Sequence, residues 1–321
     1  MTTPTKDGAA TIPGSGVAPV APKAPAALPA LEFEVPLVNP SPSGLYTATS
    51  WTEVTGPSRF LGAGVRFRTH NYGGSDAFGV WDSEWCVDPT GQLKTGERPG
   101  NLDPFAPITV WAYDECDLTE QTRVDIVERV QQNLRLLEQT AVERELAERL
   151  LIEGGSAGSS SVGLYAPPYP EADGDKLYVP FNTELTDKLY PTGDDTIVDV
   201  PDIVAAVSRI EAEFAITNTT GFIHAGAQWA AYAARYNLIT RSGAALKTPL
   251  GHTWVFGGGY TVGLENVVVG TSQPYGWRDQ VQVRESVDTT HNRRIAIAER
   301  NIVVGFERAV SAARILSYCS C

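Results

Sequence analysis

The sequence lacks any long apolar run and is sparing in cysteine. No stretch approaches the roughly 18 uninterrupted apolar residues of a membrane-spanning helix. The opening residues, MTTPTKDGAATIPGSG, also lack the apolar segment of a secretory signal peptide, so we expect a cytoplasmic protein that contacts no membrane. Neither CxxC nor zinc-ribbon spacing occurs among the four cysteines, which are Cys86, Cys116, Cys319 and Cys321. We interpret them as free or buried thiols, with a bridge through the C-terminal Cys-Ser-Cys as the alternative.

Basic residues are also scarce. The chain of 321 residues has 25 Lys and Arg against 38 Asp and Glu, for a net charge of −13. Affinity for nucleic acid depends on clustered Lys and Arg, so this composition argues against a phosphate-binding surface. A protein wall with an acidic surface can nevertheless enclose DNA without binding it.

No complete catalytic motif is present. Gly154–Gly158 matches G-x-S-x-G, but a helical pattern precedes it where a nucleophile elbow needs a strand. The run VFGGGYTVG has neither G-x-G-x-x-G nor a Walker lysine, and we interpret it as a tight turn between two strands. His224 fits a core or edge position, and only His291 has a nearby candidate ligand, Asp288, in a predicted turn. We therefore assign no catalytic, cofactor-binding or metal-binding residue and expect neither an enzyme nor a cofactor.

One unusually long helix is present instead. The pattern from Leu118 to about residue 153 is helical throughout, with Asp117 and Glu120 suited to a capping box and Gly154-Gly155 suited to the end. Average helices are about 11–12 residues long. We expect the intervening Arg and Glu residues to form a solvated face. The apolar stripe drifts where a coiled coil would keep a strict repeat, so we predict a helix packed obliquely across a sheet. The stripe comprises Val127, Val130, Leu134, Leu137, Ala141, Val142, Leu146 and Leu150.

The residues before this helix predict extended structure. Residues 1–30 form a Pro/Ala-rich tail, and 31–57 form an arm that lies on another element. Residues 58–117 resemble a β-hairpin, with strands near 78–87 and at 108–113 around a long polar tip. Trp81, Trp85 and Trp111 fall on this hairpin, where they serve either core packing or a subunit contact.

The residues after the helix alternate helices and strands. Ile203, Val207, Ile210 and Phe214 define a helix face, with Pro201 in its first turn. GFIHAG, TWVF, ENVVVG and RRIAIAERNIVVGFE read as strands, and AQWAAYAARYNLI reads as a second helix. Without regular βαβ spacing, this mixture predicts an α+β fold.

The order of these elements resembles the major capsid protein of tailed bacteriophages, the Hong Kong 97-type fold, over roughly residues 35–317. Four stretches carry the resemblance: PITVWAYDECDLTEQTRVDIVERVQQNLRLLEQTAVERELAERLLIEGG, VDVPDIVAAVSRIEAEFAITNTTGFIHAGAQWAAYAARYN, HTWVFGGGYTVGLENVVVGTSQP and VRESVDTTHNRRIAIAERNIVVGFERAVSAARI. The resemblance implies an N-terminal arm, an extended loop over 58–117, a peripheral domain over 118–195 with a spine helix at 118–153, and an axial domain over 196–275. Residues 276–321 would return to the peripheral domain as strands.

The resemblance also implies a function. Copies would assemble in the host bacterial cytoplasm into hexamers and pentamers of an icosahedral virion shell, which encloses double-stranded DNA without binding it specifically. A separate scaffolding protein, a portal and decoration proteins are the further partners it implies. The alternative function with the same fold is an encapsulin-like nanocompartment shell, which encloses an enzyme instead of DNA. A soluble enzyme with dispersed site residues is the reading from a different class.

The resemblance points to candidate subunit contacts on the extended loop. We expect contacts with a neighbouring subunit from Lys94 and Arg98 on the tip of the loop, together with Trp81 and Trp85. For the two basic residues, the alternative is a charged tip that is simply solvated. Some members join a loop lysine to an asparagine with help from a glutamate. Lys94, Asn292 and Glu299 lie in corresponding segments, although such common residues also coincide by chance.

Overall fold

The computed structural model describes residues 35–56, 62–68, 70–71, 85–86, 94, 104–118, 120–150 and 197–316. The chain divides into two units, Met1–Leu37 and Val38–Cys321, and every described helix and strand belongs to the second. The predicted tail over 1–30, most of the predicted strand at 78–87, and both Trp81 and Arg98 lie outside the described residues.

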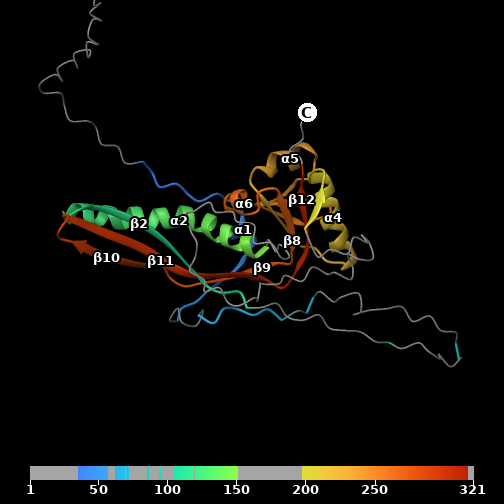
Figure 1. The fold of residues 1–321 in the computed structure, drawn as a ribbon, viewed down its shortest axis with the longest axis horizontal. Coiled ribbons are helices and arrows are strands. Elements are labelled where there is room, and N and C mark those ends of the chain that lie inside the picture. The colour runs from blue at the N-terminus through green and yellow to red at the C-terminus, as the bar shows by residue number, and fades with distance from the viewer. Residues whose placement is uncertain are drawn as a thin grey trace, which may run out of the picture. The chain divides into compact units, whose positions relative to one another are not determined.

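A five-stranded sheet is built around the long strand β11. Strand β11 pairs antiparallel with β2 on one side and with β10 and β9 on the other, and β1 pairs parallel with β9 (Figure 1). The strands are β1 (Ser50–Glu53), β2 (Ile108–Asp117), β9 (Pro274–Arg278), β10 (Gln282–Asp288) and β11 (Arg293–Phe306). The predicted strand at 108–113 is therefore present, but its partner in the described residues is β11.

The described residues of the predicted extended loop include one contact between its two legs. Val65 and Phe105 form an isolated antiparallel bridge, with reciprocal backbone hydrogen bonds of 3.0 and 2.9 Å. Phe105 is buried against Phe67 and Phe306. This bridge closes the base of the loop just before β2 begins.

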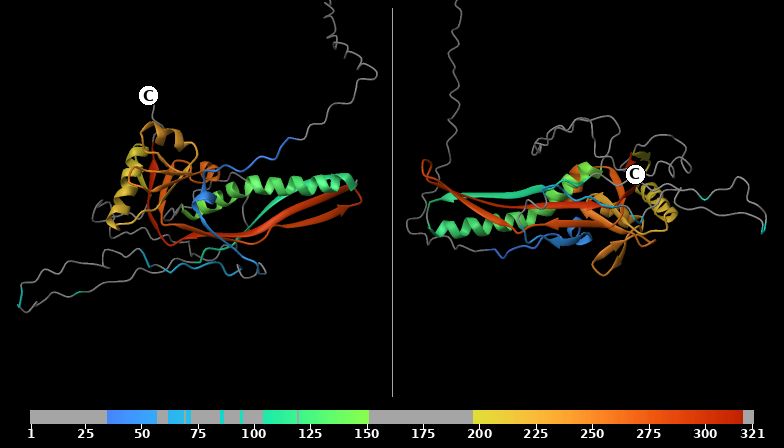
Figure 2. Two further views of the ribbon diagram at one scale, coloured as in Figure 1. Left: turned by 180° about the vertical axis from the view of Figure 1, so that it is seen from behind. Right: turned by 90° about the horizontal axis from the view of Figure 1, so that it is seen from below.

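The long helix α2 (Glu120–Leu150) packs along this sheet, against β2 and β11 (Figures 1 and 2). Its apolar side chains are buried at Ile126, Val130, Leu134, Val142, Leu146 and Leu150. Packing across a sheet, predicted in place of a coiled coil, is confirmed. The helix has 31 residues, slightly fewer than expected, because Leu118 precedes it in a bend and residues 151–153 lie outside the described part.

The predicted apolar stripe of α2 is wrong in its middle part. Leu137 is 63% exposed, whereas Glu138 and Glu143 are 3% and 0% exposed. Ala141 is exposed too. Residues four apart share a helix face, so the face that holds Leu134 and Val142 also holds Glu138. The expectation that all the intervening Arg and Glu residues are solvated fails at these positions.

A seven-stranded sheet has the strand order β3-β12-β8-β4-β7-β6-β5. The strands are β3 (Val198–Val200), β12 (Ala309–Ile315), β8 (Val267–Thr271), β4 (Phe222–Gly226), β7 (Thr253–Gly257), β6 (Ala245–Lys247) and β5 (Thr240–Ser242). The helices among them are α4 (Ile203–Ile216), α5 (Trp229–Arg235) and α6 (Gly258–Gly263). Together with the first sheet, this confirms the predicted α+β class.

The apolar face predicted for α4 is confirmed. Ile203, Val207, Ile210 and Phe214 are all buried, and α4 packs on β12. The prediction that Pro201 lies in the first turn of this helix was wrong. Asp202 is the N-cap and accepts a hydrogen bond from Ala205 N at 2.9 Å, so Pro201 precedes the cap.

The final strand also differs from expectation. Residues 276–321 were assigned as a whole to the domain of the long helix. β12 instead pairs antiparallel with β8 and parallel with β3 in the seven-stranded sheet. Consecutive strands β11 and β12 thus belong to different sheets, with Glu307 and Arg308 between them.

One hydrophobic core connects the long helix to the seven-stranded sheet. Val255, Val267 and Val269 belong to the same buried cluster as the apolar residues of α2. Their strand neighbours Trp254 and Val268 point the other way, into a second cluster with α4 and α5. Alternation along β7 and β8 therefore gives the sheet two covered faces.

His224 is a buried polar residue of the seven-stranded sheet, as expected. Its ring nitrogens lie 3.0 Å from the Tyr260 hydroxyl and 2.8 Å from Thr271 Oγ1. Burial lowers the pKa of His224 from 6.5 to about 3, so the ring stays neutral in the folded protein at neutral pH.

This burial predicts an acid-sensitive contribution to stability. The unfolded chain binds a proton at His224 below pH 6.5 and the folded chain does not until about pH 3, so stability falls as the pH falls through this window. We expect the stability advantage of wild type over His224→Gln to shrink by about 1.6 kcal/mol between pH 6.5 and about pH 5. Urea denaturation at several pH values measures the gap. A His291→Gln variant, at an exposed histidine, is the control. A gap independent of pH would contradict the prediction.

Candidate functional site, a buried glutamate joint

A polar stripe on α2 binds the arm, mostly through backbone atoms of the arm. The stripe residues follow one another at spacings of three and four, which places them on one side of the helix. Stripe residues further along α2 contact residues further along the arm, so the arm runs in the same direction as α2. The contacts are Gln132 Nε2 to Val38 O (2.8 Å), Arg135 Nη2 to Asn39 Oδ1 (2.6 Å), Gln139 Nε2 to Ser43 O (2.8 Å) and Glu143 Oε1 from Leu45 N (2.9 Å).

The arm was expected to be extended throughout, but it is not. It forms a helical turn, α1 (Leu45–Ala48), followed by strand β1. Leu45 is fully buried and belongs to the main core. Gly44 immediately before it has φ of 110°, a conformation that favours glycine. The arm therefore enters the core at Leu45, at the end of the polar stripe.

Glu143 lies where the arm, α2 and α6 meet. One carboxylate oxygen accepts from Leu45 N and the other from Gly259 N, both at 2.9 Å. These N–H groups stand in the first turns of α1 and α6, where a helix offers them no internal partner. Burial raises the pKa of the Glu143 carboxyl, and hydrogen bonds from Leu45, Gly259, Gln139 and Gly258 oppose that rise. A buried carboxylate is thus held mainly by amide donors.

The three-glycine run explains how α6 approaches so closely. A Cβ on Gly257 would lie 2.5 Å from the Glu143 carboxyl carbon, and one on Gly259 would lie 2.2 Å from Thr140 O. The run was predicted to be a tight turn between strands. It is instead the end of β7 and the first turn of α6, packed on α2 without intervening side chains.

Glu138 makes a second joint, one turn earlier. Arg300 on β11 donates to both Glu138 oxygens, with Nε to Oε1 at 2.6 Å. The Tyr46 hydroxyl donates to Glu138 Oε1 at 2.7 Å, and burial next to this carboxylate raises the Tyr46 pKa. Breaking one side of such a buried pair leaves an uncompensated charge and is strongly destabilising. The pair therefore binds the arm, α2 and β11 to one another.

Sequence reasoning missed both glutamates because charged residues were assigned to solvent by type. A usable signal was present. Glu138 lies at the four-residue spacing that joins Leu134 to Val142, and Glu143 follows Gln139 by the same spacing. Nothing local, however, identifies their partners in the arm, in α6 and in β11.

The candidate subunit contacts fall in a region that the structure describes sparsely. Trp85 is 94% exposed, as a contact residue would be in an isolated subunit. Lys94 is exposed as well. Their contact role stays a prediction, as does that of Trp81 and Arg98.

The candidate cross-link residues are not adjacent within one chain. Asn292, with φ of 52°, stands in the turn before β11. Glu299 lies seven residues further along the strand, roughly 23 Å away at about 3.3 Å per residue. Glu299 also forms an ion pair with Arg284 at 2.7 Å. A shared role for these two residues would need different subunits, and it stays a prediction.

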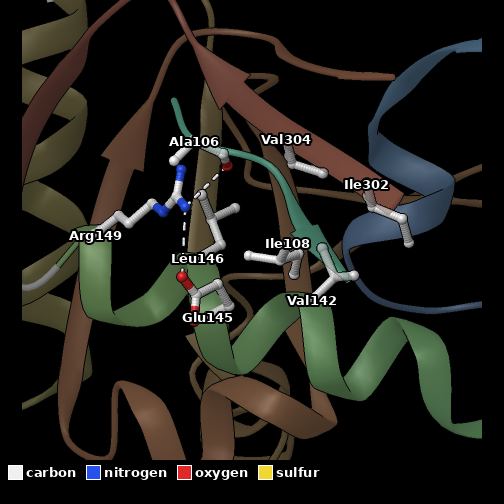
Figure 3. Close-up of a pocket in the computed structure, with 8 residues that line it drawn as sticks. All are labelled: Ala106, Ile108, Val142, Glu145, Leu146, Arg149, Ile302 and Val304. Carbon is white, nitrogen blue, oxygen red and sulfur yellow. Dashed lines mark hydrogen bonds and ion pairs between the residues drawn. The ribbon is translucent and has the colours of Figure 1, made fainter. Parts of the chain in front are cut away.

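A small hollow lies where β2 passes over the C-terminal half of α2 (Figure 3). Its lining is mostly aliphatic, and its two charged residues contact each other. Arg149 donates to Ala106 O at 3.0 Å and to Glu145 at 3.4 Å. The hollow thus lies at the base of the extended loop, where Arg149 fixes the backbone ahead of β2.

The described part of the chain contains no group of three or more His, Cys, Asp or Glu residues arranged to hold a metal ion. Nor does any described helix combine the length and the apolar character needed to cross a bilayer. Asp288 and His291 lie in the turn that was predicted, where His291 Nδ1 is 2.7 Å from Asp288 Oδ2 and His291 N donates to Asp288 Oδ1 at 3.2 Å.

Comparison with solved structures finds several phage and capsid structures that resemble this chain at very low sequence identity. No family model and no curated protein matches the chain. The capsid of an empty GTA particle is 9% identical with a TM-score of 0.45, over 91% of this chain and 96% of that one. The mature capsid of bacteriophage PhiM1 is 10% identical with a TM-score of 0.42, over 92% and 93%. A structure from Microbacterium phage Oxtober96 is 13% identical with a TM-score of 0.43, over 89% and 95%.

The glycine run supplies a matched test of the joint. A Cβ on Gly259 would meet backbone atoms of Thr140 and Arg144 at 2.2 and 2.7 Å, whereas one on Gly258 would meet only Thr140 Oγ1 at 3.6 Å. We expect Gly259→Ala to lower the free energy of unfolding by about 1–3 kcal/mol, as overpacking does. Gly258→Ala should change it by less than about 0.5 kcal/mol. Equal effects in urea denaturation would contradict this account of the motif.

Proposed function

We propose that this chain is the major capsid protein of a tailed double-stranded DNA bacteriophage, with a Hong Kong 97-type fold. The supporting observation is the arrangement around α2, in which a 31-residue helix is held on one side by a sheet and on another by its own N-terminal arm. The same core continues into a second sheet. These observations support the order of elements that the sequence resemblance implied, with β12 as the departure already described.

The physical requirements of a shell subunit fit this arrangement. A subunit that tiles a closed shell must keep its shape under load and offer contacts in several directions. Rigidity comes from α2, whose contacts with β2, β11, α6 and the arm involve elements far apart in sequence. A shell subunit needs no catalytic centre, and we propose a structural role without enzymatic activity.

Open surfaces for neighbouring copies remain in the described part of the chain. β10 and β5 each pair with a single strand there, which leaves their outer edges available. On the outward face of β2, Trp111 and Tyr113 are 46% and 43% exposed. Assembly into hexamers and pentamers would cover such edges and aromatic side chains.

Electrostatics supports containment of the genome without specific binding. A net charge of −13 repels the phosphate backbone, so a wall of such subunits would hold DNA inside by enclosure. We place the protein in the virion, after assembly in the host cytoplasm. Scaffolding, portal and decoration proteins complete the proposal as partners.

Electron microscopy of the purified full-length chain, expressed alone and with its neighbouring genes, tests this function. We expect closed polyhedral particles that contain DNA when the packaging machinery is present. Particles filled with a protein cargo would instead favour the nanocompartment. A homogeneous monomer or dimer under every condition would overturn the proposal.

The exposed tryptophan of the extended loop allows a test of a subunit contact. Because Trp85 is 94% exposed, Trp85→Ser should alter the free energy of unfolding by less than about 0.5 kcal/mol. If Trp85 packs against a neighbour, the same change should lower the yield of closed particles, measured by sedimentation. Trp85→Phe keeps an aromatic side chain and should retain most of the yield. Full yield from Trp85→Ser would show that this side chain makes no important contact.

A further inference from the structure

The Glu143 carboxylate connects two backbone segments that are more than two hundred residues apart. Leu45 N and Gly259 N bind different oxygens of the same planar group, each at 2.9 Å. Rotation of the group to follow one donor therefore moves the oxygen that serves the other. The two hydrogen bonds are geometrically dependent on each other.

Burial makes this dependence energetically important. Glu143 and Leu45 are both 0% exposed, and Gly259 is buried. Loss of a donor inside the protein leaves the carboxylate with neither water nor amide at that oxygen, which is costly for a charged group. If the arm undocks, that oxygen must turn toward water or another donor, and the oxygen that binds Gly259 N must turn with it.

The position of α6 matters for the whole seven-stranded sheet. Gly257 ends β7 and Gly258 begins α6, so α6 continues directly from a central strand. From α6, the Tyr260 hydroxyl contacts His224 on β4 at 3.0 Å, and His224 contacts Thr271 on β8 at 2.8 Å. α6 is therefore connected, directly or through these hydrogen bonds, to the three adjacent strands β7, β4 and β8.

We propose that Glu143 is a positioning residue that couples docking of the N-terminal arm to the seating of α6 on α2. In this scheme the docked arm stiffens the connection between the long helix and the seven-stranded sheet. Undocking loosens it. The arm thereby acts as an internal brace, and the inference holds for the folded subunit whether or not the chain assembles into a shell.

Hydrogen–deuterium exchange on the unassembled full-length chain tests the coupling. Leu45→Ala weakens arm docking from the arm side, and Glu143→Ala removes the shared acceptor. In the wild-type background, we expect Leu45→Ala to speed exchange of the amides of residues 258–264 roughly tenfold, the factor that corresponds to losing one buried hydrogen bond. In the Glu143→Ala background these amides already exchange fast, and Leu45→Ala should add little.

Two further variants keep the test decisive. Tyr46→Phe loosens the arm through Glu138 without making a core cavity, and it should reproduce the effect of Leu45→Ala more weakly. Glu128→Ala changes an exposed glutamate on the same helix and should leave residues 258–264 unchanged. Faster exchange confined to residues 38–53 would overturn the proposal. Equal acceleration of residues 258–264 with and without Glu143 would overturn it too, because direct packing alone would then explain the effect.

Discussion

A buried carboxylate must have hydrogen-bond donors wherever water is excluded, and this requirement organises the centre of the molecule. Glu143 satisfies it with backbone amides of the arm and of α6. Those amides can reach the carboxylate only because Gly44, Gly257 and Gly259 have no side chain where Glu143 and its neighbours on α2 lie. The need to supply the Glu143 carboxylate with donors therefore fixes the glycines, the arm and the long helix together.

The second glutamate extends this constraint to the five-stranded sheet. Glu138 holds Arg300 of β11 and Tyr46 of the arm, five residues before Glu143 on the same helix. Apolar burial around these groups supplies most of the driving force for folding, since the core contains residues from α2 and both sheets. The polar groups add specificity, because an arm displaced by one residue would leave buried charges without donors.

These features agree with the proposed role of a subunit that holds its shape within a shell. The long helix is restrained by elements from both ends of the described chain, and β11 and β12 continue from one sheet into the other. The surfaces that remain open are strand edges and exposed aromatic side chains. Rigidity inside and open edges outside together are what a self-assembling wall requires.

Where a pattern was local and periodic, the sequence alone determined the structure. The face of α4 and the strands at 222–226 and 293–306 follow from apolar spacing, which a short segment carries within itself. The overall order of elements was also sufficient to suggest a shell protein. Tertiary structure alone decided that Glu138 and Glu143 are buried, that the three-glycine run is part of a helix contact, and that β12 joins the seven-stranded sheet. Each of these depends on partners from distant parts of the chain, and no local spacing encodes which distant backbone will lie opposite a given side chain.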